Sequence, residues 1–106
     1  MVTGVAPEPS IALTSPASLT LTGSSPVRST ARLQLSLARP MGVHVAVYDV
    51  IGRRVRTLVN GPLPAGSRQV QWDGCSEHGA PVGSGIYFVR ATWAVGRQVV
   101  RVPLVH

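Results

Sequence analysis

The chain has 106 residues and a mass of 11.2 kDa, the size of one domain, and its hydrophobic content of 44% excludes a disordered chain. A single cysteine excludes an internal disulfide, and no apolar run approaches the ~18 residues of a membrane-spanning helix. The net charge of +6 comes entirely from scattered arginines that are not interleaved with aromatic residues, which favours solvated charges over a nucleic-acid surface.

The first segment, residues 1–18, is rich in proline, serine and threonine, which is typical of a linker or lead-in. Within it, residues 11–13 could add a short edge strand. The segment lacks the basic region and the continuous apolar stretch of a signal peptide, so we expect none in this chain. We therefore expect the folded domain to occupy residues 19–106.

From residue 19 onward, apolar residues alternate with polar ones, which is the pattern of half-buried strands. Strands are predicted at 31–38, 43–50 and 54–59. The residues of the first two that we expect to point inward are Ala31, Leu33, Leu35, Leu37, Val43, Val45 and Val47. His44, Ala46 and Tyr48 are expected to point outward.

Three further strands are predicted at 67–73, 85–93 and 97–105, where Pro103 suits an edge strand because it lacks an N–H group. Their expected inward residues are Val70, Trp72, Tyr87, Val89 and Ala91. Stretches rich in glycine, proline and asparagine, among them 39–42, 60–62 and 73–85, read as turns or loops between strands. Six or seven short strands without a helical period predict an all-β fold, an Ig-like antiparallel β-sandwich of about seven strands.

The segment that follows Trp72 gathers most residues with reactive side chains: Asp73, Cys75, Glu77 and His78. A structural zinc site normally takes four ligands from two separated pairs, which this segment does not supply. Calcium suits the two carboxylates better, but carboxylates in loops more often cap turns. A Cys/His nucleophile would need a positioned base and an oxyanion pocket. We therefore expect a polar loop, with no catalytic, cofactor-binding or metal-binding residue.

Arginines near one predicted hairpin tip and in the last strand form a possible partner surface: Arg53, Arg54, Arg56, Arg97 and Arg101. At the hairpin tip a solvated turn is the simpler interpretation, and contact with an anionic glycan, lipid or nucleic acid is the alternative.

Other residues have local structural reasons for their positions. Gly52 follows Asp49 in a tight turn that needs a positive φ, and Asp49 itself is expected to cap that turn. Trp72 would supply a large buried surface to a core with few aromatic residues. Tyr87, near the start of its strand, could bind loop backbone through its hydroxyl group, as in a tyrosine corner.

The segments 43–74 and 79–91 carry a set of motif residues in characteristic order: Tyr48, Asp49, Gly52, Gly66, Trp72, Asp73, Gly74, Gly85 and Tyr87. With this set, the chain resembles two related β-sandwich families. One is the C-terminal type A sorting domain of type IX secretion cargo, and the other is the Ig-like domain of the flagellar hook-capping protein. Upstream, residues 24–37 look like the lead-in and first long strand of the sorting domain.

The resemblance implies a non-catalytic C-terminal module that sorts or anchors an exported bacterial protein and is recognised by secretion machinery. It implies a protein partner, no cofactor and no small-molecule substrate, with a secreted or cell-surface location as part of a longer precursor. The alternative is a hook-capping-type module of structural assembly. A basic nucleic-acid-binding domain is a remote third interpretation.

Overall fold

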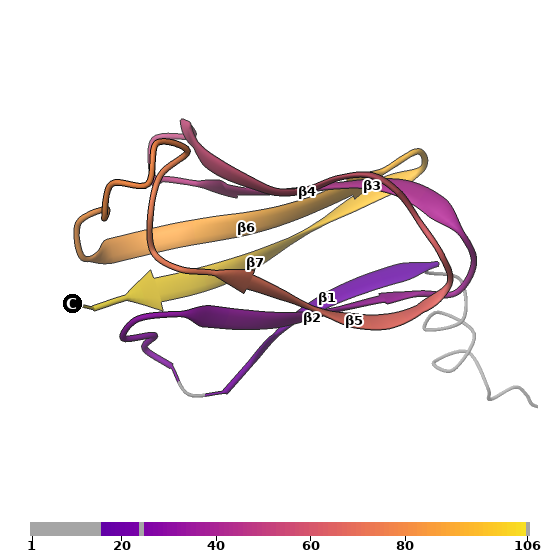
Figure 1. Ribbon diagram of the computed structural model, residues 1–106, viewed down its shortest axis with the longest axis horizontal. Coiled ribbons are helices and arrows are strands. Elements are labelled where there is room, and N and C mark those ends of the chain that lie inside the picture. Colours follow the sequence, from indigo (N-terminus) through magenta and orange to yellow (C-terminus); the bar gives the residue numbers. More distant parts are fainter. Residues whose placement is uncertain (1–15, 24, 106) are drawn as a thin grey trace, which may run out of the picture.

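The computed structural model describes residues 16–23 and 25–105, and residues 11–13, where a short strand was expected, lie outside these ranges. The described part contains seven strands (Figure 1), which are β1 (Ala17–Thr22), β2 (Ala31–Leu37), β3 (Met41–Tyr48), β4 (Arg54–Leu63), β5 (Gly66–Trp72), β6 (Gly85–Trp93) and β7 (Gly96–Leu104). Strand β1 begins at Ala17, so it includes two residues of the segment assigned above to the lead-in. Within the described ranges there is no helix of the length and hydropathy needed to cross a bilayer.

The strands form two antiparallel sheets that face each other (Figure 1). One sheet has the order β1-β2-β5, and the other has the order β4-β3-β6-β7. The loop before β6 and the C-terminal end of β7 lie at the same end of the sandwich, where Gly85 pairs with Leu104. The predicted all-β sandwich of about seven strands is confirmed.

The core lies between the sheets and is built from one face of each strand. Every residue expected to point inward in β2, β3, β5 and β6 is buried, and Leu33, Leu35 and Val45 are 0% exposed. Burying such aliphatic side chains contributes about 1.5–3 kcal/mol each relative to leaving them in water. The alternation of apolar and polar residues predicted these inward positions because each sheet has one face against the core and one face toward solvent.

One residue on the outer face departs from the expected exposure. Ala46 is 0% exposed, although it is not part of the core cluster. It pairs in register with Arg90, whose guanidinium lies over the ring of Tyr48, two residues further along β3. We attribute the burial of the small Ala46 side chain to these two long neighbours.

The stretch Asn60-Gly61-Pro62 is not a turn, contrary to the sequence-based expectation. It continues β4 and pairs with residues 42–44 of β3. Strand β4 lies at the edge of its sheet, where the missing N–H of Pro62 does not interrupt a ladder of hydrogen bonds. The chain turns instead between Leu63 and Gly66. The φ of Gly66 is 122°, a backbone conformation that favours glycine.

Candidate functional site

The turn between β3 and β4 is organised by the carboxylate of Asp49. Its Oδ1 accepts hydrogen bonds from the backbone N–H groups of Ile51 (3.1 Å) and Arg53 (2.9 Å), and its Oδ2 accepts one from Nε of Arg53 (3.0 Å). The backbone N–H of Arg53, its guanidinium and the N–H of Ile51 all favour the charged carboxylate and lower the pKa of Asp49. Gly52 has a φ of 89°, so both local expectations for this turn are confirmed.

Trp72 and Tyr87 stand at the two ends of the loop that joins β5 to β6. Their rings make an edge-type contact with centroids 5.1 Å apart, and both side chains are buried. Nε1 of Trp72 donates to the carbonyl of Cys75 at 2.9 Å, and the Tyr87 hydroxyl donates to the carbonyl of Gly83 at 2.7 Å. The loop is thus held at both ends by aromatic side chains, and the hydrogen bond of Tyr87 confirms the tyrosine-corner prediction.

The same loop is joined to the edge of β4 by its acidic residues. The backbone N–H of Glu77 donates to the carbonyl of Val55 at 3.0 Å, and the Glu77 carboxylate accepts from the N–H of Thr57 at 3.2 Å. Asp73 forms an ion pair with Arg56 at 3.0 Å and also accepts from the N–H of Cys75. These contacts give both carboxylates structural partners within the loop end of the sandwich.

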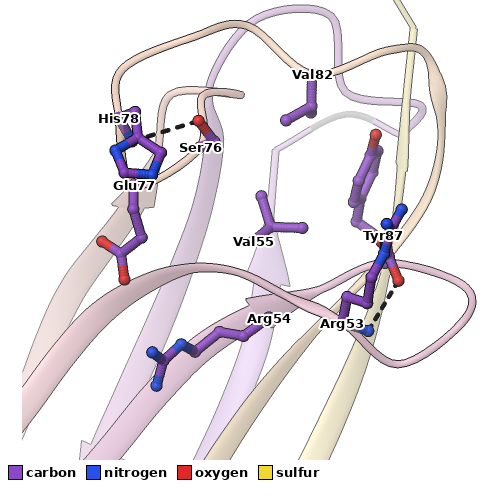
Figure 2. Close-up of a pocket in the computed structure, with 9 residues that line it drawn as sticks. Arg53, Arg54, Val55, Ser76, Glu77, His78, Val82 and Tyr87 are labelled. Atoms are coloured by element: carbon purple, nitrogen blue, oxygen red, sulfur yellow. Dashed lines mark hydrogen bonds and ion pairs between the residues drawn. The ribbon is translucent and has the colours of Figure 1, made fainter.

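A pocket of about 420 Å³ lies between this loop and the β3–β4 turn. It is lined by Asp49, Arg53, Arg54, Val55, Ser76, Glu77, His78, Val82 and Tyr87. Figure 2 shows Glu77 and His78 on one side and Tyr87 with Arg53 on the other, separated by Val55 and Val82. Ser76 lies beside His78, and the hydrogen bond between them runs from the backbone N–H of His78 to the Ser76 hydroxyl at 3.3 Å. Within residues 16–23 and 25–105, no group of three or more His, Cys, Asp or Glu residues is placed to hold a metal ion.

The three arginines near the β3–β4 turn do not form one cluster. Arg53 is paired with Asp49, and Arg56 is paired with Asp73. Arg54 is opposite Tyr48 in the ladder of β3 and β4 and therefore shares the outer face of the sheet with it. Figure 2 shows the side chains of Arg53 and Arg54 running in different directions.

The two arginines of the last strand lie on that same outer face. Arg97 and Arg101 are exposed and alternate along β7 with residues that point inward. Sequence reasoning overlooked Arg90 of β6, whose guanidinium lies 4.3 Å from the centroid of the Tyr48 ring and donates to the Tyr48 hydroxyl at 2.8 Å. In the sequence, Arg90 alternates with the inward residues Val89 and Ala91, so the signal for including it was present.

The motif glycines occupy the ends of strands and the loops between them. Gly74 lies two residues after Trp72, the last residue of β5, and Gly85 is the first residue of β6. The described motif residues thus frame the loop end of a sandwich and position its turns. The family model of the FlgD Ig-like domain matches residues 18–96, about three quarters of the chain.

The chain belongs to the FlgD Ig-like domain family. Its fold is similar to part of dimeric latent PorU from Porphyromonas gingivalis, with a TM-score of 0.64 and 24% identity over 86% of this chain and 10% of that one. A second similar structure is PorZ of the same organism, described as an essential bacterial surface component of the type IX secretion system. There the TM-score is 0.48, with 21% identity over 70% of this chain and 9% of that one. A search of curated proteins found no match.

At these identities the likeness to PorU shows the fold, and the chain spans about a tenth of the length of both proteins. The family match begins within β1 and ends at Gly96, the first residue of β7. The FlgD-type match therefore covers the strands that carry the motif residues, whereas most of β7, including Arg97 and Arg101, lies beyond it.

Proposed function

We propose that this FlgD-type Ig-like domain is a non-catalytic sorting or anchoring module of an exported bacterial protein, recognised by secretion machinery. The observation that carries the proposal is the position of the last hairpin, β6–β7, at one side of the four-stranded sheet. Its outer face presents Arg97, Val99 and Arg101 to solvent, and Val99 is 50% exposed. A module without a reaction of its own acts through such an accessible surface.

The outer face of the hairpin is more accessible than its backbone edge. Near the beginning of β7, the Gln98 side chain binds the backbone of Leu19, which holds β1 of the opposite sheet close to this strand. Near its end, the N–H of Val27 donates to Pro103 and the N–H of Val105 donates to Val27, both at 2.8 Å. Because addition of a partner strand needs free backbone groups, recognition through side chains of the outer face is favoured.

Two further observations support a sorting role. The segments 24–37, 43–74 and 79–91 resemble the sorting domains of type IX cargo in the order of their motif residues. The similar fold in PorU occupies 10% of that chain, which is the relationship expected of a small module carried by a much longer protein.

A reporter fusion tests this proposal directly. A fluorescent protein with a secretory signal peptide at its N-terminus is fused to residues 16–106 and expressed in a bacterium that has a type IX system. The same fusion is expressed in an isogenic strain without the translocon, and the reporter without the domain serves as the second control. We expect protease-accessible reporter on the cell surface only when both domain and translocon are present. Retention of the fusion inside the wild-type cells would reject the sorting role.

Membership of the FlgD Ig-like domain family favours a second candidate, a module of structural assembly. In that case the domain would pack against flagellar hook or rod subunits, or against other extracellular subunits. The distinguishing measurement is co-purification of the tagged, full-length protein with hook and rod proteins from its own cells. Stable co-purification, together with a reporter that is not exported, would favour assembly over sorting.

A further inference from the structure

The outer face of the four-stranded sheet carries a row of basic and aromatic side chains that the sequence does not reveal. In the strand registers, Tyr48 is opposite both Arg54 of β4 and Phe88 of β6, and Phe88 is opposite Arg101 of β7. Residues directly opposite in a sheet share a face, and neighbouring strands are ~4.8 Å apart, so this row spans about 14 Å. Each end of the row is an arginine, and its two central residues are aromatic.

The neighbouring positions on this face extend the same arrangement. Val99 is opposite Arg90 in the next row, and Arg97 is opposite Thr92 in the row after that. On the other side of the row, Ile86 is opposite Pro103. Ile86 and Phe88 are partly exposed and Val99 is 50% exposed, so the face mixes apolar side chains with arginines.

The described carboxylates form ion pairs or hydrogen bonds with residues other than the arginines of this face. Asp49 is engaged by Arg53, Asp73 by Arg56, and Glu77 by the backbone of β4, all at the loop end of the sandwich. The basic residues of the face are Arg54, Arg90, Arg97 and Arg101, and none of them forms an ion pair with a described carboxylate. A surface of this kind attracts a negatively charged partner and repels a second copy of itself.

We propose that the outer face of β4-β3-β6-β7 docks an acidic protein surface that has apolar residues among its carboxylates. Exposed aromatic and aliphatic residues surrounded by arginines are the composition of protein interfaces, where Tyr, Phe and Arg are enriched. A single-stranded nucleic acid would need open aromatic rings for stacking, but one face of the Tyr48 ring is covered by Arg90.

The dimensions of the face indicate the kind of contact. Three strand spacings with their side chains, and about six residues along β7, give roughly 20 Å by 20 Å, or roughly 400 Å². This is about half of the ~800 Å² that each partner buries in a standard stable complex. The face therefore suits a weak, transient contact. This inference rests on the proposed function in one respect only, which is that the partner belongs to secretion machinery.

The test uses defined probes with the isotope-labelled domain in solution. The first probe is a synthetic peptide that alternates glutamate with leucine, and the second is polyglutamate of the same charge. We expect the glutamate–leucine peptide to bind more tightly, with NMR shift changes concentrated on the outward residues of β3, β6 and β7. Binding should weaken as salt rises, because exposed charge pairs are screened. Shift changes confined to another surface, or equal affinity for both probes, would overturn the proposal.

A matched pair of variants separates this face from general charge. The triple variant Arg54→Gln, Arg97→Gln, Arg101→Gln removes three exposed arginines from the face. The control Arg28→Gln, Arg32→Gln, Arg39→Gln removes the same charge from exposed positions elsewhere. We expect the first variant to bind the glutamate–leucine peptide about tenfold more weakly and the control less than about threefold more weakly, since specific charge pairs outweigh the overall field. Equal losses would reject a specific face.

Two other polyanions test the class of partner. Duplex DNA and polygalacturonate are titrated under the same conditions, and we expect both to bind more weakly than the glutamate–leucine peptide. Tighter binding of either one through this face would overturn the choice of a protein partner.

The export assay distinguishes the two proposals. If the wild-type fusion is exported and the face variant is exported equally well, this inference fails while the sorting role stands. If the wild-type fusion is not exported but the peptide binds the face, the sorting role fails alone.

Discussion

The side-chain amide of Gln98 binds both backbone polar groups of Leu19, a residue of the opposite sheet. Its Oε1 accepts from the Leu19 N–H at 2.9 Å, and its Nε2 donates to the Leu19 carbonyl at 2.7 Å. The amide therefore occupies the place that the backbone of a neighbouring strand would take beside β1. Glu77 acts similarly at β4, where its N–H and carboxylate bind Val55 and Thr57. Side chains thus cover part of the edge of each sheet and limit pairing with other chains.

Replacing Gln98 with alanine should destabilise the domain, because both partly buried hydrogen bonds to Leu19 are lost. We expect the free energy of unfolding to fall by about 1–3 kcal/mol, as for buried backbone groups that lose their partners. Urea unfolding measures this change, and faster hydrogen exchange of the Leu19 amide locates it. Gln69→Ala is the control, since the Gln69 side chain is exposed and its described hydrogen bond is to the side chain of Gln71. If the Leu19 amide exchanged hydrogen as slowly in Gln98→Ala as in the wild type, the result would contradict this role of Gln98.

The two tryptophans should respond differently to the same substitution. Trp72 is 1% exposed and donates to the Cys75 carbonyl, whereas Nε1 of Trp93 is buried without a hydrogen-bond partner in the described part of the chain. Trp72→Phe loses packing and leaves a carbonyl without its donor, so we expect a loss of about 2–3 kcal/mol. Trp93→Phe removes an unsatisfied donor and should cost less than about 1.5 kcal/mol. Thermal and urea unfolding of both variants test the difference, and equal losses would contradict it.

The sequence predicted the parts of this fold that depend on local pattern. Alternation located the buried residues of β2 and β6, because one face of each strand meets the core and the other meets solvent. The turn capped by Asp49 and the bond of the Tyr87 hydroxyl to the loop were also predictable, because each joins residues four positions apart. In each case a chemical preference acts over a short distance along the chain.

Contacts between distant segments were not predictable in the same way. Gln98 and Leu19 are 79 positions apart, and a glutamine in a strand gives no sign of which backbone it will meet. The register shifts of β3 against β4 are likewise invisible in the alternation, so the separation of Arg54 from Arg53 and Arg56 was missed. The outer face of the sheet emerged only when the strand registers placed Tyr48, Phe88 and Arg101 in one row.

The hydroxyl group of Tyr87 should make stability fall at alkaline pH. Burial raises its pKa above the ordinary value of 10.0, and the negative charge of Asp49 raises it further. The neutral form is thus favoured in the folded state, so this contribution is fully present below about pH 10 and is lost as the pH rises through the folded pKa. Tyr87→Phe should cost about 1 kcal/mol at neutral pH through the lost bond to Gly83, and should flatten the alkaline decline. Urea unfolding across this range tests both, and an unchanged decline would contradict the assignment.

Asp49 should make stability fall at acid pH, and two variants identify the groups responsible. Its pKa is lowered from 3.8, first by the backbone N–H of Arg53 and then by the Arg53 side chain. The charged form is favoured in the folded state, so its contribution is present above the ordinary pKa and is lost as the pH falls through the folded one. We expect Asp49→Asn to reduce the acid decline of the unfolding free energy, because it removes the titrating group. Arg53→Gln keeps the backbone donor, so it should retain most of the decline. An acid limb that is flattened equally in both variants would show that the guanidinium, and not the backbone of the turn, holds the pKa down.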